Sequence, residues 1–139
     1  MPIAFSAWGD PMKEQLAEKI SRINEDLRVE SYERDGALVL FCHGAFSLVS
    51  YRQQDEVFAQ VRKASQKHIV MDLREVGHID STGVGTLAMS LKHCMAARKE
   101  LALVGNDAVR QALRTATLDT IFVQYDSVDA ALAAFASGR

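Results

Sequence analysis

Short, nearly continuous apolar runs alternate along the chain with stretches in which apolar residues recur every three or four positions. Three runs, residues 37–42, 68–73 and 101–104, each predict a strand that is buried on both faces, and residues 121–125 predict a further short strand. Each periodic stretch predicts a helix, and these stretches are residues 49–64, 82–98, 107–116 and 127–136. The alternation predicts an α/β fold, in which a mixed β-sheet with a parallel centre is covered by helices.

Residues that interrupt the pattern place the turns. The Asp35-Gly36 pair predicts a hairpin turn after a short strand over residues 29–33. Gly44 is expected to stop the strand that follows, and residues 74–79 are expected to form a loop. The inward faces expected of the first two periodic helices are Tyr51, Phe58, Val61 and Ala64, and Val84, Leu87, Ala88, Leu91 and Met95.

One further helix is expected at the N-terminal side of this domain. Asp10 can cap it, and Pro11 suits the first helical position. Its narrow apolar stripe consists of Leu16, Ile20, Ile23 and Leu27. Such a helix needs a surface on which to dock, which is the core of its own chain, a partner, or a second copy in a homodimer. We therefore predict an N-terminal extension over residues 1–28 and one domain over residues 29–139.

The composition of the chain limits the kinds of molecule that it is expected to bind. The chain has 139 residues, 48% of them hydrophobic, and a net charge of −2, which fits one globular domain. The sequence shows no basic patch, so we expect it to bind neither nucleic acid nor an anionic membrane surface. No apolar run reaches the roughly 18 residues of a membrane span, and no signal-peptide pattern opens the chain. The expected compartment is the cytoplasm.

Two cysteine–histidine pairs, Cys42-His43 and His93-Cys94, raise the question of a zinc site. Neighbouring side chains on a strand point to opposite faces, so Cys42 and His43 do not readily reach one metal ion. The spacing matches no common zinc motif either. We expect two buried thiols and no metal or other cofactor.

The stretch Asp80-Ser81-Thr82-Gly83-Val84-Gly85 lies where a buried strand leads to a helix. Asp80 or Ser81 can cap that helix by accepting a backbone N–H bond. The two glycines allow another backbone or a ligand to approach closely. Helix-terminal N–H groups and the helix dipole also make this position tolerant of an anion.

Two enzymatic alternatives use the same residues. Gly83 and Gly85 begin a G-x-G-x-x-A pattern typical of nucleotide binding, with Asp107 further along, but the predicted loop over residues 74–79 separates them from the strand. Ser81 could instead be a hydrolytic nucleophile with His78 as base. The nucleophile-elbow pattern is absent, and no third, orienting residue is evident.

The segment from about residue 35 to residue 135 resembles the STAS domain family of bacterial anti-sigma factor antagonists and related modules. The resemblance rests on Met71-Asp72-Leu73, on Ile79 directly before Asp80-Ser81-Thr82-Gly83-Val84-Gly85, and on the order of the elements that follow. It implies a non-enzymatic binding protein with Ser81 as its phosphorylation site.

The resemblance also implies partners. Unphosphorylated protein would bind an anti-sigma factor that is also a serine kinase, and so release a sigma factor. Phosphorylation of Ser81 would end the binding, and a phosphoserine phosphatase would restore it. The residues implied to contact the partner are Ser47, Asp80, Ser81, Thr82, Gly83, Val84 and Gly85.

Ser47 departs from the family pattern. It stands where antagonists of this family commonly carry an acidic residue, shortly after Gly44. Together with the N-terminal helix, this difference keeps open a second interpretation. In that interpretation the domain is a regulatory or scaffold module of another signalling complex, or of a transporter-associated one.

Overall fold

The structure, a computed structural model, describes residues 12–13, 15–16 and 27–137. Most of the helix predicted over residues 10–27, and the dimer contact expected of it, lie outside this part of the chain. The described domain consists of β1 (Arg28–Arg34), β2 (Ala37–Phe46), a 3-10 turn (Leu48–Ser50), α3 (Tyr51–Lys63), β3 (His68–Ile79), α4 (Ser81–Ala96), β4 (Glu100–Val104), α5 (Asp107–Thr115), β5 (Val123–Tyr125) and α6 (Val128–Ala136).

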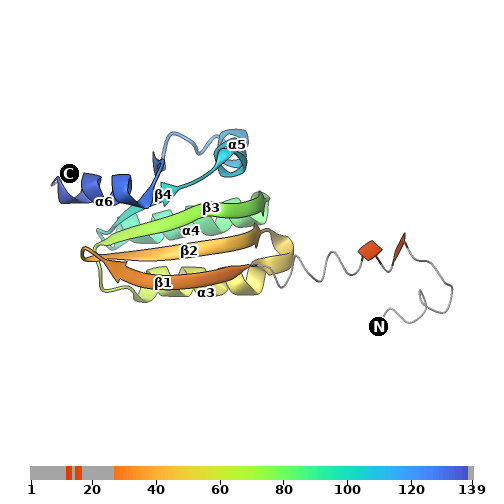
Figure 1. Cartoon of the computed structure of the whole chain (residues 1–139), viewed down its shortest axis with the longest axis horizontal. Coiled ribbons are helices and arrows are strands. Elements are labelled where there is room, and N and C mark those ends of the chain that lie inside the picture. The colour runs from red at the N-terminus through yellow and green to blue at the C-terminus, as the bar shows by residue number, and fades with distance from the viewer. Residues whose placement is uncertain (1–11, 14, 17–26, 138–139) are drawn as a thin grey trace.

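The sheet is mixed, and its strands lie in the order β1-β2-β3-β4-β5 (Figure 1). β1 is antiparallel to β2, and every later pair is parallel. This arrangement confirms the predicted sheet with a parallel centre. All parallel strands therefore end at one edge of the sheet, which we call the carboxyl edge.

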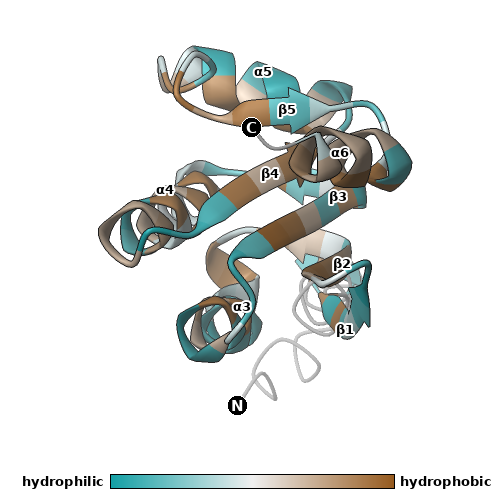
Figure 2. Ribbon diagram, turned by 90° about the vertical axis from the view of Figure 1, so that its left-hand side faces the viewer, coloured by the Kyte–Doolittle hydropathy of each residue, from teal (hydrophilic) through white to brown (hydrophobic). Residues whose placement is uncertain are grey.

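Helices cover both faces of the sheet (Figure 2). Side chains from α3, α4 and α5 pack on one face around Leu40, Met71 and Leu103. α6 packs on the opposite face, over Val39 and Val70. Successive residues of β2 and β3 thus enter opposite cores, as expected for nearly continuous apolar strands. No helix in the described ranges is long and apolar enough to cross a bilayer.

β2 does not stop at Gly44, as the sequence suggested, but continues to Phe46. Gly44 has φ +117°, and the pairing of β2 with β3 shifts in register on either side of it. Glycine can adopt this conformation inside a bulged strand without steric cost. The extra residues carry the strand to Phe46, beside the start of α4.

The loop predicted over residues 74–79 is wrong, because β3 continues to Ile79. Its second half pairs with the extended β2 after β4 has ended. The Asn106 side-chain amide donates to carbonyl oxygens that β4 no longer reaches, at 3.0 Å for Arg74 and 2.7 Å for Val76. Asn106 also caps α5 through Oδ1, which accepts from Val109 N at 2.9 Å.

Two residues expected on inward helix faces are exposed instead. Tyr51 is 48% exposed and Met95 is 69% exposed. Among the residues buried instead are Gln54 on α3 and Ser90 and Cys94 on α4. A search for apolar periodicity overlooks such polar residues, although hydrogen bonding makes their burial acceptable.

Candidate functional site

One residue, Asp80, separates β3 from α4 at the carboxyl edge of the sheet. Its Oδ1 accepts hydrogen bonds from Thr82 N at 2.9 Å and Gly83 N at 3.2 Å. Asp80 is therefore the N-cap of α4, which settles the choice left open between it and Ser81. The arrangement satisfies two helix N–H groups and places a negative charge at the positive end of the helix dipole.

The second carboxylate oxygen of Asp80 makes a contact far along the chain. Oδ2 accepts a hydrogen bond from Leu48 N at 3.1 Å, at the start of the 3-10 turn. Asp80 N donates to Phe46 O at 3.3 Å. One residue thus joins the end of β2 to the start of α4, and both of its carboxylate oxygens accept hydrogen bonds from the fold itself.

The two glycines of α4 differ in their surroundings. A Cβ at Gly83 would lie 2.0 Å from Phe46 O and 2.8 Å from Phe46 C, both backbone atoms. A Cβ at Gly85 would meet no atom within 4 Å. Gly83 is therefore required by internal packing, whereas the surface over Gly85 is open.

Ser81 is the first residue of α4 and is exposed. Within residues 27–137, no hydrogen bond engages its hydroxyl. Because Asp80 holds the helix cap, Ser81 is not needed for it. A group attached to the Ser81 hydroxyl would extend into solvent at the helix N-terminus, where the dipole favours an anion.

An apolar groove of about 540 Å³ begins beside Ser81 and runs between α4 and α5. We call it the α4–α5 groove, and its lining residues are Ile79, Asp80, Ser81, Val84, Gly85, Ala88, Ala112, Thr115, Ala116 and Leu118. Most of these side chains are small or apolar. Such a hollow suits an apolar side chain or segment better than a polar ligand.

Ser47 lies beneath this site rather than on its surface. It is 3% exposed, and its backbone oxygen accepts from Gln54 Nε2 at 2.6 Å. Gln54 Oε1 in turn accepts from the Thr86 hydroxyl at 2.6 Å, which links α3 to α4. This buried polar network orders the β2–α3 connection next to Asp80.

A family model described as STAS domain matches residues 28–131, which include every element described above from β1 to the first turn of α6. The chain belongs to the STAS domain family. Its Asp80-Ser81-Thr82-Gly83 stretch thus caps and begins α4, directly after the central strand of a STAS domain.

Solved structures share the fold of this STAS domain. An anti-sigma factor antagonist from Mycobacterium paratuberculosis is 23% identical, with a TM-score of 0.72 over 79% of this chain and 94% of that one. A sulfate transporter family protein from Wolinella succinogenes is 22% identical, with a TM-score of 0.61 over 73% and 86%. The Bacillus cell fate determinant SpoIIAA in the phosphorylated form is 14% identical, with a TM-score of 0.56 over 75% and 95%.

The enzymatic alternatives can now be compared with the geometry of the STAS domain. The turn from β3 to α4 is tight, so the long loop that counted against a nucleotide fingerprint does not exist. However, the chain's own backbone at Phe46 fills the space over Gly83. His78 is exposed, and in the described part of the chain no hydrogen bond joins it to Ser81. Internal packing thus accounts for Gly83, and among the described residues Ser81 has no hydrogen-bonded base that would activate it as a nucleophile.

Both cysteines of the STAS domain are free and buried. Burial, and secondarily the negative charge of Asp72, raises the pKa of the Cys42 thiol to about 12. In the unfolded chain this pKa returns to the ordinary value of 9.0. The folded state therefore retains a proton that the unfolded state loses between these two values, and stability falls as the pH rises through this window.

We expect Cys42→Ala to reduce this alkaline loss of stability. The wild-type free energy of unfolding should fall above about pH 9 more steeply than that of the variant, by up to about 1.4 kcal/mol per pH unit. Urea titrations of both proteins between pH 7 and pH 10.5 measure the two slopes. Parallel slopes would contradict the protonated, buried thiol, whatever the absolute cost of the cavity.

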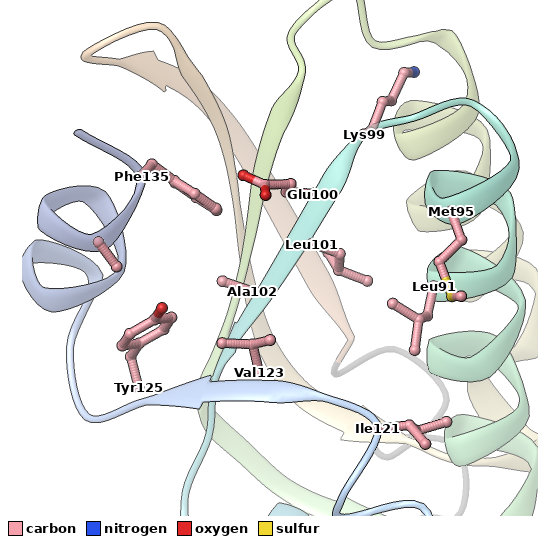
Figure 3. A pocket seen from close by; sticks show the side chains of 11 residues that line it. Leu91, Met95, Lys99, Glu100, Leu101, Ala102, Ile121, Val123, Tyr125 and Phe135 are labelled. Carbon is pink, nitrogen blue, oxygen red and sulfur yellow. The ribbon is translucent and has the colours of Figure 1, made fainter. Parts of the chain in front are cut away.

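A second hollow lies at the opposite edge of the STAS domain, beside the start of β4 (Figure 3). It measures about 230 Å³. Leu91 and Met95 of α4 line it on one side of β4, and Phe135 of α6 lies on the other (Figure 3). Ile121, which is 53% exposed, completes the α4 side. This hollow is separate from Ser81 and the α4–α5 groove.

Proposed function

We propose that this STAS domain is an anti-sigma factor antagonist that acts by binding and not by catalysis. Its partner is an anti-sigma factor with serine kinase activity, and phosphorylation of Ser81 ends the binding. The observation that carries the proposal is that two neighbouring residues at the start of α4 differ in their contacts. Asp80 holds the fold together, while the neighbouring Ser81 is exposed and its hydroxyl is unengaged within the described domain.

The physical effect of the phosphate differs between the fold and the interface. A phosphoserine carries about −1.5 to −2 charges at pH 7. At the N-terminus of α4 this charge meets the positive end of the helix dipole, so the fold tolerates it. A partner seated on the α4–α5 groove would have to desolvate the same charge beside the carboxylate of Asp80. Affinity is therefore lost without loss of structure, as a switch requires.

The residues of the motif divide into two roles under this proposal. Ser81, Thr82, Val84 and Gly85 lie on or beside the groove and contact the partner. The remaining members, Asp80, Gly83 and Ser47, shape that surface from beneath through the contacts described above. A phosphoserine phosphatase would return the protein to the binding state in the cytoplasm.

The direct test is phosphorylation by the kinase. The full-length protein and Ser81→Ala are incubated with each anti-sigma kinase encoded by the same genome and ATP, and the phosphate is mapped by mass spectrometry. We expect one kinase to modify the wild type at Ser81 alone and to leave Ser81→Ala unmodified. Absence of modification and of binding with every such kinase would overturn the proposal.

A second candidate is a STAS regulatory or scaffold module of a transporter-associated or other signalling complex. The fold similarity to the sulfate transporter family protein from Wolinella succinogenes favours it, as does the serine at position 47. Neighbouring genes separate the candidates, because a kinase or sigma factor gene supports the first and transporter genes support the second.

A further inference from the structure

Residues 1–8, Met-Pro-Ile-Ala-Phe-Ser-Ala-Trp, are non-polar at every position except Ser6. They include Ile3, Phe5 and Trp8, and Trp8 is the sole tryptophan of the chain. Large aromatic side chains favour burial by roughly 1.5–3 kcal/mol each over exposure to water. A segment of this composition therefore calls for an apolar surface to cover it.

The α4–α5 groove offers such a surface at a suitable place. The described domain begins at Leu27, which is 4% exposed and belongs to the core on the α3, α4 and α5 side of the sheet. Arg28, the next residue, pairs with His43 near the carboxyl end of β2. The chain therefore enters the domain at the carboxyl edge, where α4 and the groove begin, and on the helical face to which the groove belongs.

The length of chain before Leu27 is sufficient to reach the groove. The groove lies between α4 and α5, which pack on β3 and β4. β4 is three strand spacings from β1, about 14 Å at about 4.8 Å each. The helix predicted over residues 10–27 would measure about 27 Å at about 1.5 Å per residue. This length exceeds the distance between β1 and β4, so the chain before Leu27 is long enough for residues 1–8 to reach α4 and α5.

We propose that residues 1–8 dock in the α4–α5 groove of their own chain, with Phe5 and Trp8 as the anchoring side chains. The small residues of the groove, Gly85, Ala88 and Ala112, leave the room that aromatic rings need. Glycine inside a helix costs roughly 1 kcal/mol relative to alanine. Packing within the described domain does not explain a glycine at position 85. Room for an approaching aromatic side chain would explain it.

Docking has a consequence for regulation, and only this consequence rests on the proposed function. Ser81 lines the same groove, so residues 1–8 would compete with the partner for one surface. Removal of the segment would then strengthen binding of the anti-sigma factor. The docking itself is independent of any partner and can be tested without one.

The sole tryptophan makes the test direct. In the full-length protein, we expect Trp8 fluorescence at shorter wavelength, and acrylamide quenching severalfold weaker, than in a peptide of residues 1–8. Gly85→Gln places a side chain in the groove and suits the helix, so the domain should stay folded. In this variant, quenching should rise towards that of the peptide, while far-UV circular dichroism and a cooperative thermal transition show that the domain is still folded.

Ile121→Glu is the matched control, because it places a charge in the hollow at the opposite edge of the sheet. It should leave Trp8 quenching unchanged. Equal quenching in protein and peptide would overturn the docking, and protection insensitive to Gly85→Gln would overturn the groove as its site. Protection that appears only with dimerisation, followed by sedimentation over a concentration series, would assign the groove to the segment of a second copy and contradict docking within one chain.

Discussion

Gly83→Ala is expected to destabilise the domain by at least about 3 kcal/mol, whereas Gly85→Ala should leave it as stable or more so. The two substitutions add the same methyl group to the same helix, two residues apart. At Gly83 the new carbon would lie 2.0 Å from Phe46 O, and a backbone atom in the sheet cannot move away as a flexible side chain can. At Gly85 it meets no atom within 4 Å, and alanine improves the helix by up to about 1 kcal/mol.

Thermal unfolding of the two variants and the wild type measures this difference. For a domain of this size, the loss at Gly83 corresponds to a fall in Tm of more than about 10 °C. If Gly83→Ala melted with the wild type, the close approach of α4 to the end of β2 would be wrong.

Asp80→Ala is expected to cost about 2–4 kcal/mol, and Ser81→Ala less than about 0.5 kcal/mol. The first change removes the cap of α4 and leaves Leu48 N without its acceptor. The second removes a hydroxyl that makes no hydrogen bond within the described domain. The free energy of unfolding should therefore distinguish two neighbouring residues, although both belong to the Asp80-Ser81-Thr82-Gly83 stretch.

Asp80→Asn separates the stability contributed by the helix cap from that contributed by the hydrogen bond from Leu48 N. Its remaining oxygen can still accept from Thr82 N and Gly83 N, but its amide nitrogen cannot accept from Leu48 N. Urea unfolding should place this variant between the wild type and Asp80→Ala. A loss for Ser81→Ala as large as that for Asp80→Ala would show that Ser81 is structural and would remove the basis for a switch.

The fold could be predicted from the sequence because its signals are local. Continuous apolar runs and three-to-four periodicity determine the strands, the helices and their alternation. The extension of β2 and β3 could not be predicted in this way. It depends on pairing between strands more than 30 residues apart, on the bulge at Gly44 and on the amide of Asn106.

The candidate site, too, could be predicted only where its signals are local in the sequence. The Asp-Ser-Thr-Gly pattern indicated a capped helix, and the resemblance to STAS domains supplied the proposed role of Ser81 as a phosphorylation site. The bond from Leu48 N to Asp80 and the buried network of Ser47, Gln54 and Thr86 join elements distant in sequence. Small residues on one face of α5 were the signal for the groove, but their significance depends on the placement of α5 against α4.

The measurement closest to the central claim compares affinity and stability in one sample. The protein phosphorylated stoichiometrically at Ser81 and the unmodified protein are titrated calorimetrically with the anti-sigma factor that phosphorylates it, and both are melted. We expect the phosphate to weaken binding at least about 100-fold, or roughly 2.8 kcal/mol, while Tm changes by less than about 2 °C. Equal affinities, or a loss of affinity that accompanies unfolding, would contradict a switch that acts at the surface of an intact fold.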